Sequence, residues 1–258
     1  MMDYVSVAEA RAMAGLRLAL SVGVPGPWGE SAKAVLRARR VPFVAVAQTP
    51  LAENAELLAW TGVRNAPVAV LDDEPAACGW RDILMLAERL GSGPSLLPDD
   101  AGDRAACLAL AHDICGEDGI GWNRRLSIMA AVDRGQPAAE MPAYLRAMRA
   151  GYGAGIQPAE AAPARIAAIL HAIAARLHAQ QAQGRTYLFG DRLSAADLYW
   201  ACFSQMIVPL PQEVNPMPAY LRPLYETIEP EIAAAIDPIL LTHRDRIYRD
   251  HIGLPLDY

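Results

Sequence analysis

A short turn rich in glycine and proline places the tightest limit on how this chain folds. Residues 16–22 form an apolar run of strand length. The sequence VGVPGPWGES at 22–31 ends that run, because glycine and proline continue neither a strand nor a helix. From Glu30 the sequence ESAKAVLRARR repeats its apolar residues with the 3.6-residue period of a helix. A strand, a tight loop and a helix N-terminus gather backbone N–H groups and the positive end of a helix dipole at one point, which favours an anion or a thiolate.

The helix predicted from residue 30 is amphipathic. Its two faces consist of apolar Ala32, Val35 and Leu36 and of charged Lys33, Arg37 and Arg40. Lys33 is the only lysine of the chain, among many arginines. A surface helix of this kind packs its apolar face on a core and turns its charges to water.

The residues that follow complete a compact α/β unit. Strand patterns at 41–47, 68–71 and 76–78 alternate with helix patterns at 51–61 and 80–90, and a turn at 72–74 joins the last two strands. Pro67 stands directly before a strand, a place where proline is tolerated. The order of elements over residues 16–90 predicts one four-stranded sheet covered by helices.

A segment rich in turn residues, 92–102, then leads to a part of the chain without strand patterns. Helical periodicity covers the stretches 103–133, 139–150, 159–183, 194–207 and 217–247. We therefore expect a first domain at 1–91, a linker at 92–102 and an all-α domain at 103–258.

One helix start in the second domain carries a clear local signal. In the sequence LSAADL, Ser194 occupies the N-cap, Asp197 the N3 position of a capping box, and Leu193 faces Leu198 as a hydrophobic staple. The pattern predicts that a helix begins directly after Ser194.

Composition excludes several classes of function. The chain has 258 residues, 53% of them hydrophobic and 20% charged, and its net charge of -6 disfavours a nucleic-acid surface. No apolar run reaches the ~20 residues that cross a bilayer, and no signal peptide is evident, so we expect a cytoplasmic protein that binds neither membrane nor nucleic acid. Four cysteines without CxxC spacing and five scattered histidines predict reduced thiols and no metal site.

The α/β unit, the linker and the helical domain together resemble the glutathione transferase superfamily. The marks of the resemblance are Ala66-Pro67 and the spaced residues Gly190, Ser194 and Asp197, and it covers nearly the whole chain. It implies an α+β fold: a thioredoxin-like domain with a four-stranded mixed sheet that binds glutathione, followed by an all-α domain that binds the second substrate. It also implies a homodimer, a role in detoxification, and a cis Ala66-Pro67 bond at which the backbone of Ala66 pairs with the cysteinyl part of glutathione.

The first departure from the family pattern lies at the helix start. Many members have Ser or Cys, Pro and an aromatic residue there, whereas this chain has Gly26-Pro27-Trp28 and lacks the usual hydroxyl or thiol. The replacement donors within reach are Ser31, Ser21 and the indole of Trp28. We take Ser31 first because it lies in the first turn of the helix, and the alternative is that it is an ordinary helix-start serine.

The second departure follows the proline. Family members place a Glu/Asp-Ser pair at the start of the third helix to hold the γ-glutamyl end, but counting forward gives Cys78-Gly79 or, with a shift, Gly79-Trp80. The residues that the resemblance places against glutathione are Asn65, Ala66, Pro67, Gly79, Trp80 and Arg81.

The resemblance places the second substrate against the helix that contains AHDICGEDGIGWNRRL. Its candidate contacts are His112, Cys115, Trp122 and Arg125, with Gly119 and Gly121 making room. The alternative is that His112 and Trp122 are interior residues, that Arg124 and Arg125 are surface or interface charges, and that Cys115 is a buried structural thiol. The segment 237–258 then forms either a lid or a strap across the helices.

These residues lead to three hypotheses for function. The first is a glutathione transferase that adds glutathione to, or exchanges it on, a small hydrophobic electrophile. The second is a protein of the same fold that binds ligands or partners without thiol chemistry, as the missing side chains would allow. The third is a family isomerase or dehalogenase acting on an acidic compound held by Arg81 or Arg125.

Overall fold

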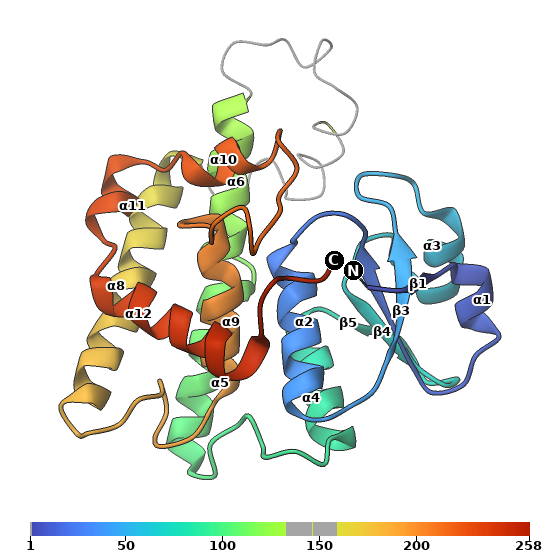
Figure 1. Ribbon diagram of the computed structural model, residues 1–258, viewed down its shortest axis with the longest axis horizontal. Coiled ribbons are helices and arrows are strands. Elements are labelled where there is room, and N and C mark those ends of the chain that lie inside the picture. Colours follow the sequence, from blue (N-terminus) through green and yellow to red (C-terminus); the bar gives the residue numbers. More distant parts are fainter. Residues whose placement is uncertain (1, 133–145, 147–158) are drawn as a thin grey trace. The chain divides into compact units, whose positions relative to one another are not determined.

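The computed structural model describes residues 2–132, 146 and 159–258 (Figure 1). By its internal contacts the chain forms two compact units. Unit 1 contains Met1–Leu97 together with Leu210–Pro218 and Tyr248–Tyr258, and unit 2 contains Pro98–Pro209 and Ala219–Ile247. The helix expected at 139–150 lies outside the described residues except for Arg146, which is helical.

Unit 1 is built on a mixed five-stranded sheet in the order β1-β3-β2-β4-β5. Its strands are β1 (Tyr4–Val5), β2 (Leu16–Ser21), β3 (Val44–Gln48), β4 (Val68–Leu71) and β5 (Ala77–Cys78). β1 and β2 run parallel to β3, whereas β4 runs antiparallel to both β2 and β5. The prediction of four strands misses β1, because two residues are too few to show an alternating pattern.

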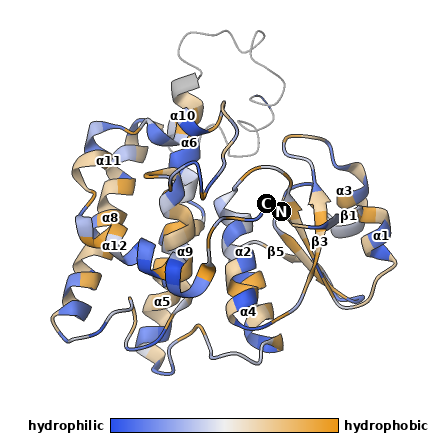
Figure 2. Ribbon diagram, viewed as in Figure 1, coloured by the Kyte–Doolittle hydropathy of each residue, from blue (hydrophilic) through white to orange (hydrophobic). Residues whose placement is uncertain are grey.

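Four helices cover the two faces of this sheet. They are α1 (Val7–Arg11), α2 (Pro27–Ala38), α3 (Ala55–Thr61) and α4 (Trp80–Leu90). Figure 1 shows α2 and α4 on one face and α1 and α3 on the other. The strands supply the core between the two layers, and β3 is coloured as mainly hydrophobic in Figure 2. Leu18 and Val46 have no exposed surface.

Two elements of unit 1 start later than the sequence predicts. The helix expected at 51–61 begins at Ala55, because Leu51 and Asn54 have the left-handed φ angles of 64° and 46° and form a turn. The Asn54 side chain closes that turn by bonding both the N–H and the carbonyl oxygen of Thr49. The strand expected at 41–47 begins at Val44.

Over its described residues, unit 2 contains helices joined by loops and no strand. It contains α5 (Ala101–Cys115), α6 (Ile120–Val132), the 3-10 turn η1 (Ala159–Ala161), α8 (Ala162–Gln181), α9 (Ala195–Phe203), the 3-10 turn η2 (Ser204–Met206), α10 (Arg222–Glu226), α11 (Pro230–Ala234) and α12 (Pro238–Ile247). Every residue of α9 is buried, and α9 packs against α5 and α12. α9 is therefore the central helix of this unit.

The single helix predicted at 103–133 is wrong, because the chain breaks between α5 and α6. Asp118 has a φ of 59°, and Gly119 approaches the preceding helix so closely that an added Cβ would lie 2.7 Å from the carbonyl oxygen of Asp113. A continuous helix would keep its residues on fixed faces, and the break removes that relation for His112 and Trp122.

The helical stretch predicted at 217–247 consists of three separate helices. The chain there forms α10, α11 and α12, and each has a proline within its first two positions: Pro223, Pro230 and Pro238. Proline suits the start of a helix and disrupts its interior, so a run of spaced prolines divides the segment.

The start of α9 confirms the predicted capping box. The Asp197 carboxylate accepts hydrogen bonds from the N–H and the hydroxyl of Ser194 at 2.8 Å and 2.6 Å. It also accepts from the N–H of Leu188 at 2.9 Å. His243 Nε2 lies 2.8 Å from this fully buried carboxylate without the alignment of a hydrogen bond.

Arg124 is a buried anchor of unit 2, so the expectation of a surface or interface charge is wrong. Its side chain is 2% exposed. Its guanidinium donates to the carbonyl oxygens of Met206 at 2.8 Å, Leu224 at 2.9 Å and Thr227 at 2.5 Å. A guanidinium satisfies several carbonyls at once because its donors are fixed in a fork, and here it ties α6 to the chain around α10.

Candidate functional site

The register of unit 1 brings three features to one edge of the sheet. Ala19 of β2 pairs with Val68 of β4, and Val68 pairs in turn with Cys78 of β5. Because these neighbours are antiparallel, the end of β2 lies beside the start of β4 and the end of β5. The loop into α2, the Ala66-Pro67 bond and the first residues of α4 therefore meet at this edge, which we call the G edge.

The N-cap of α2 offers backbone groups at the G edge but no side chain, and the indole of Trp28 stays a predicted donor. Gly26 is the N-cap with extended backbone angles of -65° and 121°, and its carbonyl oxygen accepts the first intrahelical bond, from Glu30 N at 2.9 Å. Pro27 has no N–H, so the backbone N–H groups of Trp28 and Gly29 precede that bond. An added Cβ at Gly26 would meet no atom within 4 Å, so a side chain fits there.

Ser31, the first choice for a replacement donor, is turned inward. It is 1% exposed, and its hydroxyl donates to the carbonyl oxygen of Trp28 at 3.0 Å. A role as thiol donor stays a prediction, and it requires the hydroxyl to leave that carbonyl. The hydroxyl of Ser21, the second choice, donates to Gln48 Oε1 at 2.6 Å across the end of β3.

The second feature of the G edge is the segment before β4. The Ala66-Pro67 bond is cis, as the resemblance implies. Asn65 before it is exposed, whereas Ala66 and Pro67 are partly buried. Gln48 lies behind this segment, since its amide donates to the carbonyl oxygens of Thr49 at 2.8 Å and Arg64 at 3.4 Å.

The third feature is the N-terminus of α4. Gly79 is its N-cap with a φ of 87°, a left-handed angle that favours glycine. Trp80 is partly buried, and Arg81 and Asp82 in the first turn are exposed. Partial burial and the nearby Asp82 raise the pKa of Cys78, so this thiol stays protonated at neutral pH. The start of this helix presents backbone N–H groups, which are hydrogen-bond donors.

The candidate contacts to the second substrate all lie in unit 2, on α5 and α6. His112 is exposed, and Trp122 and Arg125 are partly buried. Arg125 donates to the Tyr225 hydroxyl at 3.2 Å and lies 5.8 Å from the centre of its ring. Cys115 is 3% exposed and donates to the Ala111 carbonyl at 2.8 Å, and burial raises its pKa well above the usual range, which makes it a structural thiol.

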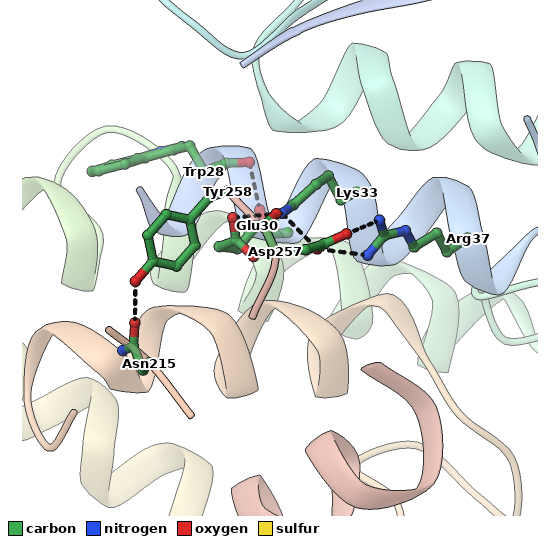
Figure 3. Close-up of polar contacts among 8 residues, drawn as sticks. Trp28, Glu30, Lys33, Arg37, Asn215, Asp257 and Tyr258 are labelled. Carbon is green, nitrogen blue, oxygen red and sulfur yellow. Dashed lines mark hydrogen bonds and ion pairs between the residues drawn. The ribbon is translucent and has the colours of Figure 1, made fainter. Parts of the chain in front are cut away.

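Sequence reasoning missed a charged cluster on the flank of α2. Lys33, expected on the solvent face, is 2% exposed. Its ammonium lies 2.8 Å from Glu30 Oε1 and 3.1 Å from Asp257 Oδ1. Figure 3 shows the Asp257 carboxylate between Lys33 and Arg37, with Arg37 donating to its two oxygens at 3.1 Å and 2.6 Å.

The cluster shifts the pKa values of its acids in opposite directions. Burial raises the pKa of Glu30 although Lys33 opposes the shift. Partial burial acts the same way on Asp257, but hydrogen bonds and charge from Arg37 and Lys33 outweigh it and lower its pKa to about 2. Burial, followed by the charges of Glu30 and Asp257, raises the pKa of Tyr4 to about 12. The only sequence signal for this cluster was the single lysine.

Two classes of site are absent from the part of the chain that the structure describes. Over residues 2–132, 146 and 159–258, no group of three His, Cys, Asp or Glu side chains is placed to hold a metal ion. Over the same ranges, no helix is both long and apolar enough to span a bilayer.

The fold has close counterparts among solved structures. A glutathione transferase from Xanthobacter autotrophicus Py2 is 18% identical, aligns over 93% of this chain and 96% of its own, and gives a TM-score of 0.58. The chain has the glutathione transferase fold. A second protein with this fold, from Methylobacillus flagellatus KT with glutathione bound, is 14% identical over 92% of this chain and 96% of its own, with a TM-score of 0.57.

A third glutathione transferase family member, from Pseudomonas fluorescens Pf-5 with two glutathione molecules bound, is 14% identical. It aligns over 92% of this chain and 97% of its own, with a TM-score of 0.55. No family model matches the sequence, and no curated protein is significantly similar to it. At these identities the likeness establishes the glutathione transferase fold, and the reaction has to be argued from the residues.

Proposed function

We propose that this protein binds glutathione at the G edge of unit 1 and adds it to, or exchanges it on, a small hydrophobic electrophile. The observation that carries the proposal is the meeting of three backbone features at one sheet edge: the start of α2, the segment before Pro67 and the start of α4. Two proteins of the same fold were solved with glutathione bound.

Each feature has a chemical part in this proposal. The first-turn N–H groups of α4 receive the γ-glutamyl carboxylate, with Arg81 beside them, and the backbone of Ala66 pairs with the cysteinyl part. The N–H groups of Trp28 and Gly29 at the start of α2 face the sulfur and favour the thiolate. On the likeness of the fold, we also propose a homodimer that takes its second substrate in unit 2.

The first test measures glutathione binding by calorimetry on the purified protein, with a matched pair of variants on α4. Arg81→Ala should weaken binding several-fold, because an exposed charge near a bound carboxylate contributes about 0.3–1 kcal/mol. Arg89→Ala should leave binding unchanged, since Arg89 lies at the other end of α4 and pairs with Glu74. No binding at millimolar glutathione would remove the proposal altogether.

The second test measures conjugation to a general aryl halide at saturating glutathione, which separates reaction from binding. Turnover supports the transferase. The proposal of a catalyst fails if the protein binds glutathione and turns over no electrophile in a panel of aryl halides, epoxides and disulfides.

One observation favours a second candidate, a ligand-binding protein of this fold without turnover. The position that holds a hydroxyl or thiol in many members of the superfamily is Gly26, and Ser31 directs its hydroxyl into its own helix. A thiol at this edge then receives backbone dipoles without a hydroxyl or thiol from the N-cap position. Affinity for hydrophobic ligands without any thiol turnover would favour this candidate over the transferase.

A further inference from the structure

The last residues of the chain belong to unit 1, where they lie along α2. The π-helical turn η3 (Tyr248–Ile252) packs against α2, and Figure 1 shows the C-terminal end of the chain beside that helix. Beyond η3 the chain has two neutral anchors. The N–H of Leu256 donates to the Val214 carbonyl at 2.9 Å, and the Tyr258 hydroxyl donates to Asn215 Oδ1 at 3.1 Å.

Between these anchors lies a charged one. Arg37 donates hydrogen bonds to both carboxylate oxygens of Asp257. The Lys33 ammonium donates to Oδ1 and to the backbone carbonyl oxygen of the same residue. Charge-assisted pairs of this geometry are the strongest polar contacts that a side chain forms. Asp257 is therefore the residue that fastens the segment to α2.

The residues that precede the Asp257 contact are exposed to solvent. Gly253, Leu254 and Pro255 are exposed, Gly253 has a φ of 89°, and the chain on both sides of them is anchored by Tyr248 and Leu256. An exposed stretch between two anchors lets the residues beyond it move as one piece, because few contacts hold the stretch itself. Residues 253–255 can therefore act as a hinge for residues 256–258, and Asp257 holds those residues against α2.

Glu30 opposes the contact between Asp257 and α2. The Lys33 charge is shared between Glu30 and Asp257, and the two carboxylates repel each other across it. Asp257 also has Arg37, whereas Lys33 is the cation that it shares with Glu30, so part of its attraction to α2 is divided with a second carboxylate.

We propose that residues 256–258 are a latch that covers the Lys33 flank of α2 and opens about Gly253 when Asp257 leaves Lys33 and Arg37. Closed, the latch keeps Lys33 at 2% exposure. Open, it uncovers the Lys33 ammonium about one helical turn from the already exposed Arg37 guanidinium, and together they form a surface on which a carboxylate ligand competes with Asp257. The latch stands independently of the reaction proposed for the G edge.

The single lysine provides a direct measure of opening. Acylation of the native protein with an amine-reactive ester, followed by mass spectrometry of the peptide that contains Lys33, reports how often the latch is open. Asp257→Asn should raise the acylation rate about tenfold, because local opening sets the reactivity of a buried group. Added salt should raise the rate of the wild-type protein and leave that of Asp257→Asn nearly unchanged, since screening acts on the ion pairs that the variant lacks.

A control and a second readout keep the result specific. Asp250→Asn removes a carboxylate of the same segment that pairs with its neighbour Arg249, and it should not alter the rate. Hydrogen exchange at the Leu256 amide should accelerate in Asp257→Asn in step with acylation, because opening also breaks the bond to Val214. The latch is overturned if Leu256 stays protected while Lys33 reacts faster, or if both readouts match the wild type in a variant of unchanged melting temperature.

Discussion

Placing a serine at position 26 is the sharpest test of how this protein treats a thiol. Gly26 has backbone angles open to any L-residue, and an added Cβ meets no atom within 4 Å. Its backbone bonds, from its N–H to the Val24 carbonyl and from Glu30 N to its own carbonyl oxygen, are both 2.9 Å and need no side chain. Gly26→Ser therefore adds a hydroxyl at the start of α2 without moving the helix.

The expected effect follows from the energy that favours the thiolate. A thiol with a pKa near 8.5 is ionised only to about 3% at pH 7, and each pKa unit corresponds to about 1.4 kcal/mol. A helix N-terminus supplies about 0.3–1 kcal/mol when exposed and up to ~2 when partly buried. A hydroxyl that donates to a charged acceptor adds about 1.5–3 kcal/mol before solvent screening. Gly26→Ser should then lower the pKa of bound glutathione by about one unit and raise the conjugation rate at pH 6.5 about tenfold.

The assay is a pH titration of the thiolate absorbance of bound glutathione, together with conjugation rates across the same pH range. Gly26→Ala is the matched control, since it adds the same Cβ without the hydroxyl and should leave the thiol pKa where it is. Serine is also the better N-cap, so Gly26→Ser should gain a few tenths of a kcal/mol in unfolding free energy. The reasoning is refuted if both variants bind glutathione and their thiol pKa values are equal, because the sulfur then lies away from the start of α2.

Three further outcomes follow from contacts in the two units. Ser31→Ala should change the conjugation rate by less than about threefold, because its hydroxyl donates within the helix, and a larger loss would return Ser31 to the role of thiol donor. Arg124→Leu should lower the unfolding free energy by about 3 kcal/mol in urea titrations, since it leaves buried carbonyls unpaired, and Arg124→Lys should recover part of it. The lowered pKa of Asp257 stabilises the fold above pH ~4, and this stabilisation is lost as the pH falls towards 2. Because the Arg37 and Asp257 side chains are 42% and 35% exposed, Asp257→Asn should remove only about 1 kcal/mol of that acid-dependent stability, measured against Asp250→Asn.

The parts of the fold that sequence predicts are those encoded by near neighbours. The turn before α2 follows from glycine and proline, and the capping box at Ser194 and Asp197 from side chains three residues apart. Signals of this kind survive folding because they depend on backbone geometry within a few residues. The grouping of the start of α2, the segment before Pro67 and the start of α4 was implied by the family resemblance, and no local pattern contains it.

The rest depends on contacts that no local pattern records. The break between α5 and α6 requires Gly119 to approach the backbone of the preceding helix, and Gly119 in the sequence reads equally well as a bend or as room for a ligand. The burial of Arg124 depends on carbonyls as far as 103 residues away, and that of Lys33 on a carboxylate 224 residues away. Helical periodicity placed Lys33 on the solvent face, and the alternative reading took Arg124 as a surface or interface charge, because neither reading includes a partner far away in the sequence.

Under the proposed function, the charges beside α2 leave position 26 as the one that decides the chemistry. Glu30 and Asp257 carry two negative charges, Lys33 and Arg37 carry two positive ones, and the four side chains pair with one another. A neutral cluster adds little field at the start of the helix, whereas an unpaired Glu30 in the first turn would repel a thiolate. In the proposed complex, with that charge balanced, the helix dipole and the group at the N-cap are what act on the sulfur. Glycine at the N-cap adds no donor to the dipole, and the dipole by itself falls short of the two pKa units that a mostly ionised thiol at neutral pH requires.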